Sequence, residues 1–122
     1  MSCLFTSLLA ASGLNAGGGG LITHVKLRNQ LVDFIEEHVD EYKEHATAAS
    51  EGALTFRQYC ARMRSPATMG DFTMICAAAQ KFHWCIFIHI GRHQHVVCFY
   101  EQNERNVHIR YTPGHYEPLL IN

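Results

Sequence analysis

The sequence has no excess of charge of one sign and no long apolar run. Lys and Arg number 10 against 11 Asp and Glu, and the two signs are interspersed. A chain without a basic patch has no electrostatic footprint for nucleic acid or for an anionic membrane surface. No apolar stretch is long enough to span a bilayer. We therefore expect a monomer that binds neither nucleic acid nor membrane and that recognises its partner by shape and local contacts.

Paired cysteine motifs are also missing. The five cysteines are odd in number and scattered, and none forms a C-x-x-C pair. This usage argues against a disulfide framework and favours reduced thiols in a cytoplasmic protein, with the nucleus left open. Residues 4–16 are mildly apolar, but they lack the basic region that precedes the core of a secretory signal.

The four glycines of residues 17–20 do not have the pattern of a nucleotide site. Neither the Lys-Ser/Thr ending of a phosphate loop nor the spaced glycines of a dinucleotide fingerprint is present. The run predicts a flexible connection, and no cofactor is expected. The whole chain, residues 1–122, is expected to form one domain whose core needs no metal or disulfide.

The first two thirds of the chain carry helical patterns. Apolar residues recur at helical spacing near residues 3–9, 23–39, 56–63 and 72–79. Within the second of these segments, Arg28 falls largely away from the apolar stripe and is expected on the surface. The polar stretch 42–52 predicts a ragged helix end and a loop. The motif Thr68-x-x-Asp71 predicts a capping arrangement before the last helix.

The last third carries strand patterns. Residues 83–90 are β-branched and aromatic, which predicts a strand covered on both faces, with Trp84, Ile86, Ile88 and Ile90 in the core. Further strands are expected at 95–100 and 107–111 in an antiparallel meander, with a short strand or tail at 115–120. The predicted class is α+β, with helices packed on a mainly antiparallel sheet.

Cys3 stands at the opening of the first predicted helix. Unpaired backbone N–H groups and the positive end of the helix dipole favour a thiolate at such a position. Leu4, Phe5, Leu8 and Leu9 form an apolar face that would fix the direction of the thiol. Cys3 is therefore a candidate nucleophile, and a frayed terminal residue is the alternative.

His115 is the best candidate for the imidazole base that a thiol nucleophile needs. It follows the Pro113-Gly114 turn, which can place a side chain at the rim of the sheet. Glu117 lies two residues further on, on the same side of an extended chain, where its carboxylate could orient the ring. The alternative is a solvated turn histidine.

Six short motifs follow one another along the chain: Cys3-Leu4-Phe5, Lys26-Leu27-Arg28, Phe56-x-x-Tyr59-x-x-x-Met63, Thr68-Met69-Gly70-Asp71, Ile88-His89 and Gly114-His115-Tyr116. Their order and spacing resemble the ovarian tumour (OTU) family of cysteine proteases. The resemblance implies a papain-like fold and hydrolysis of ubiquitin or ubiquitin-like isopeptide linkages, with ubiquitin or polyubiquitin chains as partner. It also implies that Cys3 is the nucleophile, that His115 is general base and acid, and that Glu117 takes the place usually held by Asp or Asn.

The chain departs from the family pattern just before the nucleophile. The family has Asp-Gly-Asn before Cys-Leu-Phe, in a loop that helps to form the oxyanion hole, whereas only Met1-Ser2 precede Cys3 here. Loss of one oxyanion donor can cost on the order of 100-fold in rate. We expect either a fragment of a longer protein, truncated at the N-terminus, or an enzyme of impaired activity.

Two alternatives to an active thiol hydrolase stay open at this point. One is a catalytically impaired OTU-like module that binds ubiquitin. The other is a metal-binding domain, although no C-x-x-C or H-x-x-x-H pair anchors its ligand set. That set would be drawn from Cys85, His89, His93, His95 and Cys98.

Overall fold

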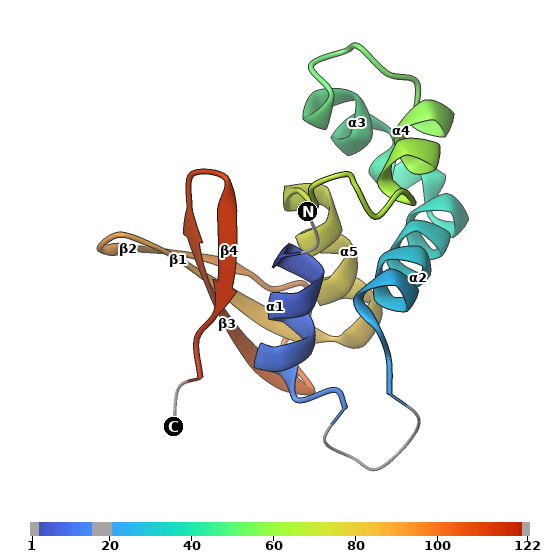
Figure 1. Cartoon of the computed structure of the whole chain (residues 1–122). Helices are drawn as coiled ribbons and strands as arrows, with labels where there is room; N and C mark the ends of the chain where they lie inside the picture. The colour runs from blue at the N-terminus through green and yellow to red at the C-terminus, as the bar shows by residue number, and fades with distance from the viewer. Residues whose placement is uncertain (1–2, 16–20, 121–122) are drawn as a thin grey trace.

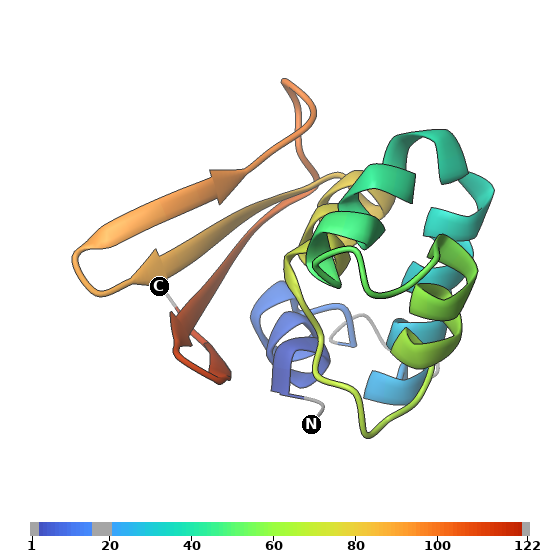
Figure 2. The same ribbon diagram turned by 90° about the horizontal axis from the view of Figure 1, so that it is seen from above.

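The structure is a computed structural model that describes residues 3–15 and 21–120. Within those residues, five helices come first: α1 (Cys3–Ser12), α2 (His24–Glu37), α3 (Val39–Ala49), α4 (Phe56–Met63) and α5 (Phe72–Phe82). Four strands follow: β1 (Trp84–Ile90), β2 (His93–Val97), β3 (Arg105–Thr112) and β4 (His115–Pro118). α1 and α5 pack against the sheet, and α2, α3 and α4 lie on the far side of these two helices, as Figures 1 and 2 show. The predicted α+β class is confirmed, and the predicted glycine loop at 17–20 lies outside the described residues.

The four strands form a mixed sheet in the order β2-β1-β3-β4. β1 pairs antiparallel with β2 and parallel with β3, and β4 adds to β3 as an antiparallel edge. The predicted meander is wrong, because residues 98–104 carry the chain back across β1 instead of turning directly into the next strand. The return ends where Glu104 N donates to His83 O at 2.7 Å, so β3 starts beside the start of β1. β1 becomes an inner strand, in agreement with its apolar sequence.

The core lies between the helices and the inner face of the sheet. Leu4, Phe5 and Leu8 of α1 are fully buried, and α1 packs against both β3 and β4. From β1 the inner side chains Trp84 and Ile86 are buried as predicted, whereas Ile90 at the end of the strand is 43% exposed. This arrangement places the start of α1 against the sheet edge that carries β4.

Side-chain caps define where several helices begin. Thr23 accepts from Lys26 N at the start of α2, and Thr55 forms a capping box with Gln58 at the start of α4. The cap of α5 is Asp71, which accepts from Met74 N, and not the Thr68-based arrangement that the sequence suggested. The stretch 42–52, predicted as a ragged helix end followed by a loop, is helical in α3 as far as Ala49. In the described part of the chain, no helix has the length and apolarity needed to cross a membrane.

Candidate active site

Cys3 is the first residue of α1 and is partly buried against the core. The next two side chains, Leu4 and Phe5, are fully buried, so the first turn of the helix is held on its inner side. The first backbone N–H groups of a helix have no partner within the helix, and they are available to an anionic group. A thiol at this position therefore lies beside donors that could hold a developing negative charge.

The backbone at Gly70 passes directly over this first turn. A Cβ atom at Gly70 would lie 2.7 Å from Leu4 Cδ2 and 2.8 Å from Phe5 Cε2, closer than real Cβ contacts. Only glycine lets the segment 68–71 approach α1 this closely. The segment thus covers the two residues that follow the candidate nucleophile.

Arg28 of α2 ties this segment to α1. Its guanidinium donates to Met63 O at 2.7 Å and to Thr68 O at 2.7 Å, and it lies 4.3 Å from the centre of the Phe5 ring. The prediction that Arg28 is a surface residue is wrong, because its side chain is fully buried. Burial lowers the pKa of the guanidinium, which nevertheless stays charged at neutral pH. The charge is stabilised by carbonyl oxygens and by the face of an aromatic ring.

His115 and Glu117 lie on one side of β4. His115 Nε2 and Glu117 Oε2 are 3.9 Å apart, a distance for an ion pair and too long for a hydrogen bond. The other carboxylate oxygen, Oε1, accepts from Arg110 Nη1 at 2.9 Å, because the register pairs Arg110 with Glu117. The His115 side chain is 58% exposed. The structure thus brings the two predicted residues together and adds Arg110, which sequence reasoning missed because the contact depends on the strand register.

Tyr116 lies between these two residues and points to the opposite, buried side of β4. Its pKa is raised to about 12, mainly by burial, with contributions from Tyr111, Asp71 and Cys3. Tyr116 therefore lies on the side of β4 that faces the core, to which Cys3 and α1 also pack. In both views the start of α1 and the β3–β4 turn lie at the same end of the molecule (Figures 1 and 2). Within residues 3–15 and 21–120, however, no hydrogen bond joins Cys3 to His115.

An apolar groove of about 340 Å³ adjoins this end of the sheet. It is lined by Phe72, Ile88, Ile90, His95, Tyr111 and Tyr116. Phe72 and Ile90 are each 43% exposed, and the Phe72 ring meets the His95 ring edge-on at 5.5 Å. The sequence placed Ile90 in the core, because periodicity does not reveal where a strand extends past the end of the helix that covers it. Through Tyr116 the groove reaches the strand that carries His115.

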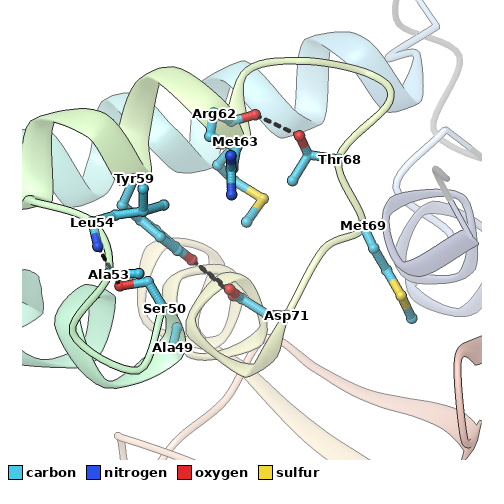
Figure 3. A pocket seen from close by; sticks show the side chains of 10 residues that line it. All are labelled: Ala49, Ser50, Ala53, Leu54, Tyr59, Arg62, Met63, Thr68, Met69 and Asp71. Carbon is cyan, nitrogen blue, oxygen red and sulfur yellow. Dashed lines mark hydrogen bonds between the residues drawn. The ribbon is translucent and has the colours of Figure 1, made fainter.

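A second cavity, of about 200 Å³, lies beneath the segment 68–71 and is drawn in Figure 3. There the Tyr59 hydroxyl points at Asp71 and donates to its carboxylate, with both oxygens 2.8 Å away. Burial raises the pKa of Asp71, and the Tyr59 hydrogen bond opposes that shift. Thr68 Oγ1 donates to Arg62 O at 2.8 Å on the far wall. These contacts brace the segment, and the lining residues of this cavity include no cysteine and no histidine.

The sheet register divides the metal-ligand set considered from the sequence between the two faces of the sheet. His95 pairs with Ile88 and His93 with Ile90, so both histidines point to the same face of the sheet as these two isoleucines. Cys85 and His89 belong to the opposite set, because alternate residues of a strand point to opposite faces. Among the described residues, no three His, Cys, Asp or Glu side chains converge on a point that could hold a metal ion.

Comparison with known proteins decides the family. The family model described as OTU-like cysteine protease matches residues 2–118. The chain belongs to the OTU-like cysteine protease family. No curated protein sequence matches it.

Solved structures of OTU domains share the fold of this OTU-like chain. The OTU domain of OTUD1 superimposes with a TM-score of 0.69 at 15% identity, over 96% of this chain and 77% of that one. An OTU deubiquitinase from Wolbachia pipientis wMel gives 0.69 at 21% identity, over 98% and 82%. The same deubiquitinase bound to ubiquitin gives 0.69 at 19% identity, over 98% and 89%. The papain-like OTU fold expected from the sequence is therefore confirmed.

Proposed function

We propose that this OTU-like chain is a thiol hydrolase that cleaves isopeptide linkages of ubiquitin or a ubiquitin-like protein. Cys3 is the nucleophile, His115 is the general base and acid, and Glu117 orients the imidazole. The observation that carries the proposal is the packing of α1 against β4, which brings the helix that begins with Cys3 and the strand that begins with His115 to one end of the sheet. The family and the ubiquitin-bound structural neighbour support the substrate class.

The proposed reaction begins with proton transfer from the Cys3 thiol to His115. The thiolate attacks the carbonyl carbon of ubiquitin's C-terminal glycine, and the negative charge on the oxygen is held by backbone N–H groups at the start of α1. His115 then gives its proton to the leaving lysine amine. A water molecule, deprotonated by His115, hydrolyses the thioester and releases Cys3.

In this proposal Glu117 acts by orientation. Its carboxylate lies between the cations of Arg110 and, once protonated, His115. A carboxylate so placed stabilises the imidazolium and fixes which ring nitrogen carries the proton. Because hydrogen bonds at an active site often tighten only when substrate is bound, the 3.9 Å separation is compatible with this role.

The proposal is tested with ubiquitin that carries an electrophile at its C-terminus. The chain should form one covalent adduct, and peptide mass spectrometry should place it on Cys3. Cys3→Ala should abolish the adduct. The matched control is Cys98→Ala, because the Cys98 thiol is exposed and follows β2, a strand that does not contact α1. An adduct that persists in Cys3→Ala, or that disappears in Cys98→Ala, would overturn the assignment.

A second candidate function is a ubiquitin-binding module of impaired catalysis. Two observations favour it. Within the described residues no hydrogen bond joins Cys3 to His115, and one carboxylate oxygen of Glu117 is already engaged in the ion pair with Arg110. Turnover of fluorogenic ubiquitin and affinity for ubiquitin, measured on the same preparation, separate the two functions. Tight binding without turnover or adduct formation would favour the module.

A further inference from the structure

Two cysteines outside the candidate active site face each other across β1 and β2. Ile86 lies opposite Val97 at the last step of the antiparallel register, and Cys85 and Cys98 are the next residues beyond that step on the two chains. Directly opposite residues of such a pair have Cα atoms about 4.5 to 5.5 Å apart. A disulfide needs Cα atoms about 4.4 to 6.8 Å apart. A pair that continues this antiparallel register would fall within the spacing that a disulfide requires.

The two thiols are in contact and differ in character. Cys98 is exposed, and its sulfur accepts from Asn103 Nδ2 at 3.1 Å. The hydrogen bond from Cys85, together with Asn103, lowers the pKa of Cys98. Cys85 is buried; burial and its interaction with Cys98 raise its pKa to about 11. Cys98 is thus the more readily ionised and accessible sulfur, and Cys85 lies beside it as a second thiol.

We propose that Cys85 and Cys98 are a redox modification site that forms a reversible intrachain disulfide in the presence of a peroxide. The Cys98 thiolate attacks one peroxide oxygen, the O–O bond breaks, and Cys98 becomes a sulfenic acid while the other oxygen leaves as water. Cys85 then loses its proton, its sulfur attacks the Cys98 sulfur, and the sulfenic oxygen leaves as a second water. Two thiols lose two protons and two electrons, and one peroxide takes them up and is reduced to two waters.

The location of the pair keeps this chemistry apart from the candidate nucleophile. Cys85 shares the face of β1 that carries Phe87 and His89, whereas α1 packs on the opposite, inner face. The buried thiols Cys60 and Cys76 have pKa values raised to about 11 by burial. They are poor competitors for peroxide, since the thiolate is the reactive form. We therefore expect oxidation to join Cys85 specifically to Cys98.

The test uses the full chain with Cys3→Ala, so that the candidate nucleophile cannot react. The chain is treated with a stoichiometric amount of hydrogen peroxide, blocked with iodoacetamide, digested and examined by mass spectrometry. The expected product is a cross-linked peptide pair containing Cys85 and Cys98, lighter by two hydrogens than the two reduced peptides. A dithiol reductant should restore both alkylatable thiols.

Single variants define the order of events. Cys98→Ser should abolish the cross-link, and Cys85→Ser should leave Cys98 as a sulfenic acid that a dimedone probe captures. Cys76→Ser is the matched control and should form the cross-link like the parent chain. Equal alkylation of Cys98 before and after peroxide would overturn the proposal. So would a disulfide that joins Cys98 to any cysteine other than Cys85, or to a second chain.

Discussion

The two sides of the candidate active site are built differently. On the nucleophile side, Cys3 begins a helix whose next two residues are fully buried, beneath a segment held by the buried Arg28. On the base side, His115 is 58% exposed at the start of a short edge strand, and Glu117 is held only by exposed ion pairs. Core packing positions the thiol, and strand register positions the imidazole.

This difference predicts which substitutions should change stability and activity together and which should change activity alone. Buried packing contributes to the folding of the whole domain, so a change on the nucleophile side should alter both the free energy of unfolding and turnover. Exposed ion pairs contribute little to folding. A change on the base side should therefore alter turnover and leave the free energy of unfolding nearly unchanged.

The largest expected effect is that of His115→Ala on turnover. Loss of a general base typically costs about 100- to 10,000-fold in rate, while an exposed substitution should change the free energy of unfolding by less than about 0.5 kcal/mol. Turnover of fluorogenic ubiquitin and chemical denaturation of the same samples measure the two quantities.

Glu117→Ala is the companion to that experiment. We expect it to reduce kcat less than His115→Ala does, because water or a neighbouring side chain can partly replace an orienting acceptor. Arg110→Ala is the control for the Arg110–Glu117 ion pair, which is half exposed and should be worth less than about 1 kcal/mol. A greater loss of turnover in Glu117→Ala than in His115→Ala would contradict the assigned roles.

On the nucleophile side, Arg28→Met should lower the free energy of unfolding by roughly 3 kcal/mol, because charge-assisted hydrogen bonds to two buried carbonyl groups are lost. The rate at which the ubiquitin electrophile labels Cys3 should fall as well, since the segment 68–71 loses its anchor. Arg57→Met is the matched control, because Arg57 is an exposed arginine on α4. Equal stability of the two variants would show that Arg28 does not brace the site.

Arg28 also marks the limit of prediction from the sequence. The pattern of apolar residues predicted that α2 has a buried face, and this holds for Leu27, Leu31 and Ile35. The same pattern placed the charged Arg28 in solvent. Periodicity depends only on side-chain polarity, so it does not reveal that backbone carbonyl groups of distant segments can accept hydrogen bonds from a buried arginine. The partners of Arg28 at Met63 and Thr68 lie 35 and 40 residues away.

The sheet shows a related limit. The strand patterns predicted four extended segments near their observed positions, and they predicted that His115 and Glu117 share one side of β4. They did not predict that β1 and β3 are parallel neighbours, because an alternating or apolar strand pattern is compatible with either direction of pairing. The contacts between Arg110 and Glu117 and between Cys85 and Cys98 follow from register, which the patterns leave undetermined.

Gly70→Ala should produce a smaller effect than Arg28→Met on the same side of the site. The added methyl group would overlap Leu4 and Phe5, and overpacking of this kind typically costs about 1 to 3 kcal/mol. The displaced first turn should also slow labelling of Cys3. Gly91→Ala is the control for labelling, because a Cβ atom at Gly91 meets nothing within 4 Å. Unchanged labelling in Gly70→Ala would show that the segment does not position the nucleophile.

The smallest expected effect is a pH dependence of stability on the outer face of the sheet, near the base side. His108 Nδ1 lies 2.9 Å from His89 Nε2, and the His108 ring stacks on Phe87. Arg110 is a further cation on this face. Burial, and then the charge of His89, lower the pKa of His108 below its ordinary value of 6.5.

A lowered pKa means that the unfolded chain binds a proton more readily than the folded chain does. The contribution of His108 to stability is therefore complete above pH 6.5 and is lost as the pH falls through the interval down to the lower folded value. Because the ring is only partly buried, the change should be small. The difference in free energy of unfolding between the parent chain and His108→Gln, measured at about pH 7.5 and again at about pH 5, above and below the ordinary histidine pKa, isolates this contribution from those of the other histidines. The parent chain should lose more stability on acidification than the variant, and parallel losses would show that the contact between His89 and His108 does not oppose protonation.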